Sequence, residues 1–296
     1  MKRDWLAPRM ADLGTNAIRE ILKVVGRPGM ISLAGGIPAP ESFPLDLVEE
    51  LTRQALSTYG AGALQYEATE GFGPLREALV PYLADKGVDT QADSILIASG
   101  SQGVLDGLGK VCIGRGDKVA VEAPTYLGAL QAFSPYGPRY LPLATDSDGV
   151  IPGALEELLR RERVKIIYLV PTFQNPTGRT LSLARRRAVA ELIQTHDVLL
   201  VEDDPYSALR YRGEPLPPIK HFAPDHVAYI STLSKVFAPG LRIGFVAAPE
   251  PIRKALVKVK QGVDLHTSTL GQALAAVYLD GGHLAAHLPK IISLYK

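Results

Sequence analysis

The chain has 296 residues, of which 46% are hydrophobic and 21% are charged, with a formal net charge of +1. This length suffices for one large domain or two smaller ones with a real hydrophobic core. The near-neutral charge gives no electrostatic reason to expect nucleic acid or an anionic membrane as a partner, so we expect neither. The single cysteine, Cys112, excludes an internal disulfide and favours a reducing compartment. Without an apolar signal segment or a run of bilayer length, the chain is expected to be cytoplasmic.

The first 47 residues differ in pattern from the rest of the chain. Residues 15–25, TNAIREILKVV, are predicted to form a short helix, and residues 26–44 are rich in glycine and proline. Clusters of glycine and proline mark turns and loops rather than sheet. We therefore expect residues 1–47 to form an arm or a lid.

From about residue 94 onward, short apolar segments alternate with longer amphipathic ones. The predicted strands cover residues 94–100, 118–124, 139–144, 165–171, 198–204, 227–231 and 243–249, and the predicted helices cover residues 103–113, 126–137, 152–163 and 182–197. Continuous Val, Ile and Leu runs between helices are typical of strands buried on both faces, so we expect an α/β fold with a mostly parallel sheet and helices on both faces. Such sheets bind ligands at the carboxyl ends of their strands. Residues 249–280 are predicted to form one long helical stretch, and another helix begins at residue 283.

The sequence ASGSQG, residues 98–103, places Gly100 between a predicted strand and a predicted helix. The backbone N–H groups of Ser101 and Gln102 would then lie at a helix N-terminus beside a hydroxyl, where a phosphate group binds favourably. An ordinary helix-capping serine explains the same residues, so both interpretations stay open. Tyr126, in APTYLG, follows another strand end, where an aromatic face can stack on a flat ring.

Three carboxylates end the predicted strand in VEDDPY, residues 201–206. Acidic side chains at the end of a buried strand need a partner or solvent, and a cationic ring nitrogen is one such partner. A solvated loop or a salt bridge is the alternative. In PTFQNPTG, residues 171–178, Asn175 precedes a proline, which holds its backbone extended so that its amide can point into the crevice at the strand ends. The alternative is that these residues serve only to form a turn.

Residues 230–244, ISTLSKVFAPGLRIG, set Lys235 in an apolar stretch. An ammonium group is costly to bury unpaired, so the stretch indicates either a surface loop or a site where a neutral amine attacks a carbonyl. Thr232 and Ser234 offer hydroxyls nearby, and Arg242 offers a planar cation suited to a phosphate. A lysine among phosphate-binding groups is typical of a site that binds a phosphorylated aldehyde cofactor through its amine.

His283 and His287 lie four residues apart on a predicted helix, which is a spacing that metal ligands use. No acidic or thiol partner is close in sequence, so no metal site is expected.

Taken together, SGSQ, PTY, QNPTG, EDDPY and STLSKVFAPGLRIG resemble, in this order, the fold type I pyridoxal-phosphate aminotransferases of class I/II. The segments SLAGGIPAPESFP, LQYEATEG and KQGVDLHTSTL are most similar to the branch that contains 2-aminoadipate and kynurenine aminotransferases. The resemblance runs through nearly the whole chain. It implies an aspartate aminotransferase-like fold, pyridoxal 5'-phosphate as the cofactor, and transfer of an amino group between an amino acid and a 2-oxo acid. The amino acid would be of the 2-aminoadipate, aromatic or branched/hydrophobic type.

The resemblance also implies roles for single residues. Lys235 would form the internal aldimine and then shuttle a proton between the substrate Cα and the cofactor. Asp203 would pair with the pyridine nitrogen and keep it protonated, while Tyr206 and Asn175 would bond the phenolate oxygen of the ring. Tyr126 would stack on the ring.

Further roles concern the phosphate, the substrate and a second subunit. The groups implied to hold the phosphate or to line the cofactor site beside it are Gly100, Ser101, Gln102, Thr232, Ser234 and Arg242. Tyr66 would reach the phosphate of the partner subunit's cofactor, which implies a homodimer. Gly36 and Asn175 would line the substrate pocket, and Arg19 would meet a distal substrate carboxylate, although a solvated arginine on a helix surface is the alternative.

The resemblance fails at the end of the chain. Members of this family continue with a segment that builds most of the small domain and supplies the arginine for the substrate α-carboxylate. We therefore expect residues 1–47 to be the arm and part of the small domain, and residues 48–296 to be the large domain, ending where the interdomain helix begins. The hypothesis that follows is a chain that binds pyridoxal phosphate, is marginally stable and transaminates poorly.

Three alternatives to the aminotransferase stay open on the sequence. A pyridoxal-phosphate lyase or decarboxylase would use the same strand-end residues. A ligand-sensing module of a winged-helix regulator would share the domain, although the chain lacks a basic N-terminal helix-turn-helix. A remnant that binds cofactor without turnover, or that pairs with a longer subunit, is the third.

Overall fold

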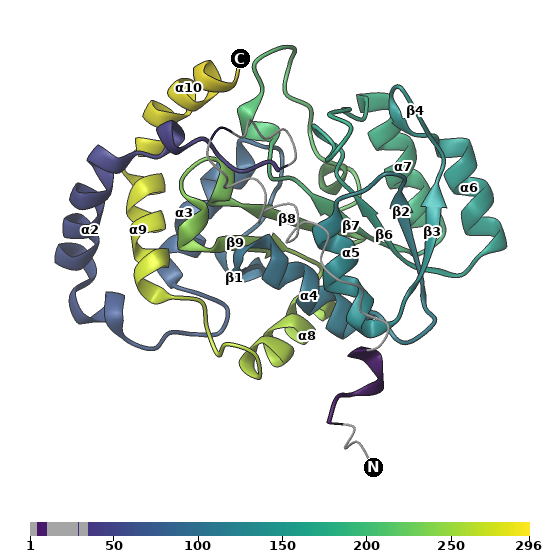
Figure 1. Cartoon of the computed structure of the whole chain (residues 1–296), viewed down its shortest axis with the longest axis horizontal. Helices are drawn as coiled ribbons and strands as arrows, with labels where there is room; N and C mark the ends of the chain where they lie inside the picture. Colours follow the sequence, from purple (N-terminus) through teal and green to yellow (C-terminus); the bar gives the residue numbers. More distant parts are fainter. Residues whose placement is uncertain (1–4, 11–28, 30–34) are drawn as a thin grey trace.

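The computed structural model describes residues 5–10, 29 and 35–296. Their centre is a seven-stranded sheet with the order β1-β9-β8-β7-β6-β2-β3 (Figure 1). The strands are β1 (Ile95–Ser99), β2 (Lys118–Glu122), β3 (Arg139–Leu143), β6 (Val164–Leu169), β7 (Leu199–Asp203), β8 (Val227–Thr232) and β9 (Ile243–Ala247). Neighbouring strands from β3 to β8 pair parallel, whereas β9 pairs antiparallel with both β8 and β1. The mostly parallel sheet predicted from the sequence is confirmed.

Helices cover both faces of the sheet, as predicted. One face packs against α4 (Gly100–Cys112), α5 (Leu127–Phe133) and α8 (Glu250–Gln261). The other face packs against α2 (Leu45–Tyr59), α3 (Gly73–Ala84), α6 (Pro152–Arg161), α7 (Leu183–Thr195) and α9 (Thr269–Asp280). In Figure 1, α2, α3 and α9 gather at one end of the sheet and α6 and α7 at the other.

The alternation of side chains along each strand produces these two layers. In β6, Ile166 and Tyr168 belong to the core on the α4 face, while Ile167 and Leu169 belong to the core on the opposite face. Successive side chains of a strand point to opposite faces, so a continuous apolar run supplies two cores at once.

The single helical stretch predicted for residues 249–280 is wrong, because two helices, α8 and α9, replace it. The segment 262–268 between them is held by side-chain bonds: Lys260 Nζ donates to Asp264 Oδ1 at 2.6 Å and to Thr267 Oγ1 at 3.1 Å. Ser268 then caps α9 by accepting from the backbone N–H of Gly271. The predicted final helix is confirmed as α10 (His283–Tyr295).

Three features of the fold were not predicted. The helices α2 and α3 pack with α9 on one face of the sheet, and a small hairpin, β4 (Thr145–Asp146) with β5 (Gly149–Val150), follows β3. The third is the reversed direction of β9. The division of domains at residue 47 stays a prediction. No helix among the described residues is long and apolar enough to span a bilayer.

Candidate active site

The loops that carry the candidate residues meet at one edge of the sheet. Strands β2, β6, β7 and β8 run parallel, so the residues that follow them lie at the same edge. Strand β1 runs in the same direction, because it is antiparallel to β9, which is itself antiparallel to β8. The reversed strand β9 therefore starts at this edge and places Arg242, the residue before it, beside the end of β1.

The three carboxylates at the end of β7 have different surroundings. Glu202 accepts the backbone N–H groups of Ile219 and Lys220, each at 2.8 Å. Asp204 lies beside the Lys86 ammonium at 3.5 Å and accepts the hydroxyls of Ser207 and Tyr229, each at 2.5 Å. The protein itself supplies hydrogen-bond donors to both. Asp203 is therefore the carboxylate of the three that can still accept a hydrogen bond.

Asp203 is 3% exposed and points to the α4 face of the sheet, because it alternates with Glu202 along the strand. Its Oδ2 accepts the Tyr168 hydroxyl at 2.8 Å, and its Oδ1 is buried without a hydrogen-bond partner among the described residues. Burial raises the pKa of Asp203 to about 7, although the Tyr168 hydroxyl opposes this shift. A buried acceptor without a donor is costly, so a cationic N–H group placed here would satisfy Oδ1 and lower that pKa.

Lys235 ends the short helical turn Leu233–Lys235 that follows β8. Its Nζ donates to the Gly36 carbonyl at 2.7 Å and lies 5.9 Å from the centre of the Tyr206 ring. Burial lowers the pKa of Lys235, and within the described part of the chain no carboxylate lies at ion-pair distance from it. The amine is therefore disposed to be neutral and nucleophilic.

Asn175 and Tyr206 come together from the loops after β6 and β7. The Asn175 amide donates to the Tyr206 hydroxyl at 3.3 Å. Burial raises the pKa of the Tyr206 phenol, so it stays a neutral donor near neutral pH. Beside them, a Cβ on Gly36 would lie 3.9 Å from the Tyr206 hydroxyl, which places Gly36 in the same group.

The N-terminus of α4 and Arg242 form a compact corner. Gly100 begins α4 with a φ of +75°, and its N–H donates to the Arg242 carbonyl at 2.9 Å. Strand β9 approaches so closely that a Cβ on Gly244 would overlap the backbone of Gly100 and Ser101. The Arg242 side chain is exposed and donates to the Ser99 and Pro239 carbonyls, each at 3.3 Å. Backbone N–H groups and a guanidinium thus meet at one place that suits an anion.

Thr232 and Ser234 shape the turn that carries Lys235. The Thr232 hydroxyl is buried, lies 2.8 Å from both the Ile243 carbonyl and the Ser234 hydroxyl, and accepts the Ser234 N–H at 3.1 Å. These bonds fix the turn between β8 and Lys235. The contact of either hydroxyl with a phosphate stays a prediction.

Tyr126 precedes α5 and is half-buried. Its ring packs so tightly on Gly128 that a Cβ there would overlap it. The Gln102 amide donates to the Gly128 carbonyl at 2.8 Å, which ties the start of α4 to the Tyr126 turn. Gln102 thus has a structural bond in addition to its predicted place beside a phosphate.

The remaining predicted residues are Tyr66, Arg19, His283 and His287. Tyr66 is 77% exposed, and its ring meets His266 edge to face at 5.6 Å. Arg19 lies outside the described residues. His287 is buried and bonds the Tyr278 hydroxyl at 2.8 Å, and no group of three or more metal-ligating side chains is found in the described part of the chain.

Sequence reasoning missed three supporting residues. Tyr168 holds Asp203, and its signal was a lone hydroxyl within the apolar run of β6. Gln174 is buried and joins Pro124 to Thr177, which fixes the loop of Asn175. Gly244 had no signal, because its role depends on the reversed direction of β9.

The sequence matches the profile of the family described as "Aminotransferase class I and II" over residues 29–293. The chain belongs to this family. It is 44% identical to aromatic-amino-acid aminotransferase 1 from Thermococcus litoralis, over 99% of this chain and 72% of that protein.

Two solved structures are similar along almost the whole chain. A kynurenine aminotransferase from Pyrococcus horikoshii matches with a TM-score of 0.93 and 41% identity, over 98% of this chain and 74% of that one. The alpha-aminoadipate aminotransferase LysN from Thermus thermophilus, complexed with N-(5'-phosphopyridoxyl)-L-leucine, matches with a TM-score of 0.90 and 37% identity, over 98% of this chain and 73% of that one.

The predicted family, fold and reaction class are therefore confirmed. The protein is a transaminase that moves an amino group between an amino acid and a 2-oxo acid. Its fold is that of the fold type I aminotransferases. This family generally uses pyridoxal phosphate.

Proposed function

We propose that this transaminase binds pyridoxal 5'-phosphate at the edge of the sheet where Asp203 and Lys235 meet, and acts on aromatic or 2-aminoadipate-type amino acids. The observation that carries the proposal is the buried, unpartnered Oδ1 of Asp203. Its position at the carboxyl end of β7, with Lys235 at the end of the next strand, fits a ring that carries a cationic nitrogen at one side and an aldehyde at another.

The residues present fit this cofactor on chemical grounds. The protonated pyridine nitrogen would donate to Asp203 Oδ1 and supply the missing partner. The amine of Lys235, which burial biases toward its neutral form, is the nucleophile for the aldehyde carbon. Arg242 and the first N–H groups of α4 would hold the phosphate, with Ser101, Gln102, Thr232 and Ser234 supplying further polar groups. Tyr126 would pack on the ring.

When bound, pyridoxal phosphate supplies an electron-withdrawing ring that stabilises negative charge at the substrate Cα. The chain's own residues do the rest. Lys235 Nζ would take the proton from the substrate Cα and deliver it to the cofactor, because a neutral amine near the reacting carbon can act as base and then as acid. Asp203 would stabilise the positive ring nitrogen, and Asn175 and Tyr206, which bond each other, would offer an amide N–H and a hydroxyl to the ring oxygen.

The relatives support the proposed substrate class. Their names state that they act on aromatic amino acids, kynurenine and 2-aminoadipate. We propose that Gly36 and Asn175 line the substrate pocket and that Arg19 pairs with a distal carboxylate of 2-aminoadipate. We further propose that the protein works as a cytoplasmic homodimer in which Tyr66 reaches the partner subunit's cofactor, since Tyr66 projects from its own chain.

The test is the release of 2-oxo acid from L-phenylalanine and from L-2-aminoadipate, measured by mass spectrometry with enzyme loaded with pyridoxal phosphate and present in stoichiometric amount. Lys235→Ala should abolish release from both substrates. Arg19→Gln should lower the apparent second-order rate constant of release at least tenfold for 2-aminoadipate and leave that for phenylalanine within about twofold, because only 2-aminoadipate carries the distal charge. Equal losses with both substrates would contradict the role of Arg19, and release by Lys235→Ala would contradict the proposed chemistry.

A further inference from the structure

A cavity of about 940 Å³ lies on the face of the sheet opposite the candidate active site. It is bordered by the end of α3, the start of α10 and the loop at residues 207–218. Glu202 and Asp204 line it, whereas Asp203 between them points to the α4 face. Glu202 and Asp204 therefore face the cavity from the side of the sheet opposite to Asp203.

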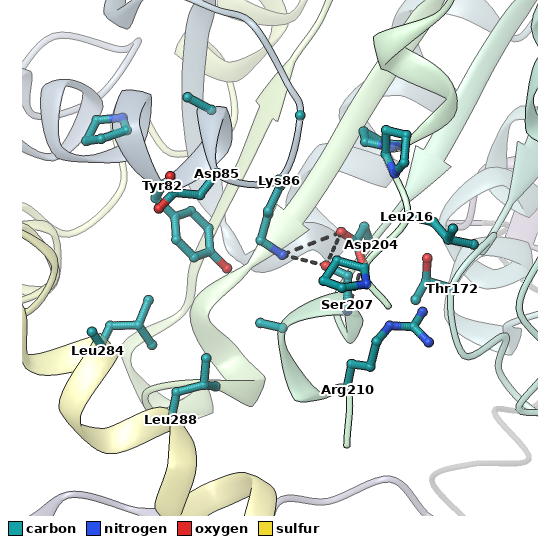
Figure 2. Close-up of a pocket in the computed structure, with 18 of the residues that line it drawn as sticks. Tyr82, Asp85, Lys86, Thr172, Asp204, Ser207, Arg210, Leu216, Leu284 and Leu288 are labelled. Atoms are coloured by element: carbon teal, nitrogen blue, oxygen red, sulfur yellow. Dashed lines mark hydrogen bonds and ion pairs between the residues drawn. The ribbon is translucent and has the colours of Figure 1, made fainter. Parts of the chain in front are cut away.

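One wall of the cavity is apolar. It is formed by Tyr82 from α3 and by Leu284 and Leu288 from α10, with Leu216 on the other side (Figure 2). A cavity of this size that combines an apolar wall with polar groups able to orient a ligand is typical of small-molecule sites.

The acidic groups that line the cavity leave little free negative charge inside it. Asp204 is paired with Lys86 and accepts the hydroxyls of Ser207 and Tyr229. Glu202 accepts two backbone N–H groups and lies 4.0 Å from Arg186, and burial raises its pKa to about 7.

The other two acids, Asp85 and Asp280, are exposed at the rim, where water screens them. The buried Arg186 guanidinium is occupied too, since it donates to three backbone carbonyls and to the Thr172 hydroxyl.

Arg210 is the exception among the charged groups. Its guanidinium stacks over the Phe173 ring at 4.6 Å and donates to the Arg212 carbonyl at 3.3 Å. Among the described residues, no carboxylate lies at ion-pair distance from it. In Figure 2 its guanidinium lies beside Thr172, on the side of the cavity away from Leu284 and Leu288. Most of its five donors are thus available in a fork that matches a carboxylate.

We propose that this cavity is a second ligand site, which binds a small hydrophobic carboxylate. The carboxylate pairs with Arg210, and the apolar body of the ligand packs on Tyr82, Leu284 and Leu288. Lys86, which donates to Asp204 and Ser207 and lies 5.1 Å from the centre of the Tyr82 ring, is a further polar group at the centre of the cavity. The proposal does not depend on the cofactor or on the substrate class proposed above.

The experiment is a calorimetric titration of the protein, loaded with pyridoxal phosphate, with 4-phenylbutyrate and with its uncharged amide. The parent chain should bind the acid at least about tenfold more tightly than the amide, because a charge-assisted bond to Arg210 is lost in the amide. Arg210→Gln should weaken binding of the acid by a similar factor. The matched control is Arg212→Gln, which removes an exposed positive charge from the same loop without touching the cavity.

A second variant guards against an effect on folding. Ala285 is exposed on α10 and lines the cavity, so Ala285→Trp fills the space without removing a core residue. It should abolish binding of both the acid and the amide while circular dichroism stays unchanged. Binding of the acid that survives both Arg210→Gln and Ala285→Trp would place the ligand elsewhere and overturn the proposal, as would an absence of binding to the parent chain.

Discussion

At the scale of single residues, the candidate site is defined by the ionisable groups that the protein leaves without a partner. Three consecutive acids end β7, yet only Asp203 keeps an oxygen without a donor. Burial raises the pKa of Asp203 and lowers the pKa of Lys235, which favours the neutral form of each. A cofactor that brings a cation to Asp203 and an electrophile to Lys235 would satisfy both groups at once.

The neighbours Asp203 and Asp204 therefore respond differently to the same change. Asp203→Asn removes the charge that faces the site but retains an acceptor for Tyr168, so the fold should lose no stability while turnover falls about 10²-fold or more. Asp204→Asn leaves Lys86 buried without its counter-ion and should lower the free energy of unfolding by roughly 3 kcal/mol or more. Denaturant unfolding and 2-oxo acid release measure the two effects. Similar losses of stability in both variants would contradict this distinction.

Asp203 also makes the stability of the cofactor-free chain depend on pH. Its pKa rises from the ordinary 3.8 to about 7 on folding, so between pH 4 and 7 the folded state binds more protons than the unfolded state. The free energy of unfolding must then fall as pH rises through this window, by at most about 1.4 kcal/mol per pH unit for this group.

Glu122 and Glu202 have pKa values raised in the same direction, so the pH dependence of the parent chain alone does not isolate Asp203. The difference between Asp203→Asn and the parent does isolate it. Asp203→Asn should gain stability relative to the parent as pH rises from 4 to 7, measured by urea unfolding without cofactor. A difference that is constant with pH would refute the shifted pKa.

At the scale of elements, hydrophobic patterning was sufficient to predict the strands of the central sheet but not the direction of β9. Buried strands such as β6 and β7 read as continuous apolar runs bounded by turns, so both were predicted close to their observed ends. The direction of β9 could not be predicted from the sequence, because an apolar strand has the same residue pattern whether it pairs parallel or antiparallel. The break between α8 and α9 was missed because it depends on the Lys260, Asp264 and Thr267 bonds rather than on proline.

The reversed β9 makes a specific prediction about the corner at α4. Gly244→Ala would push β9 away from the backbone of Gly100 and Ser101, so the affinity for pyridoxal phosphate should fall at least tenfold and the thermal midpoint should decrease. Gly240→Ala is the matched control, since a Cβ there meets nothing within 4 Å. Cofactor titration by absorbance measures both. Unchanged affinity in Gly244→Ala would mean that this corner does not hold the phosphate.

At the scale of the whole molecule, the loops that carry the candidate residues lie at one edge of the sheet because their motifs follow strand ends, and parallel strands end together. Lys235 and Gly36 are 199 residues apart in sequence yet share a hydrogen bond. Tyr66 could not be placed in the same way, because its expected partner site belongs to a second chain. In this structure it is exposed, as are Leu64, Val263 and Leu265.

The proposed dimer can be tested by mixing two defective chains. Lys235→Ala lacks the amine, and Tyr66→Phe lacks the hydroxyl that is proposed to reach the other subunit. After mixed refolding, about a quarter of the sites would carry both native residues if each site combines one from each chain. Activity of the mixture should then exceed the mean of the separate variants. A mixture that merely averages them would indicate that each chain builds its site alone.

The central claim is that Lys235 holds pyridoxal phosphate opposite Asp203. The most direct measurement is reduction of the cofactor-loaded protein with borohydride, followed by peptide mapping. The account predicts a single phosphopyridoxyl adduct on Lys235, with loss of the bound-cofactor absorbance band, and no adduct on the buried Lys86 or Lys220. An adduct spread over surface lysines, or none on Lys235 in a folded sample, would contradict it.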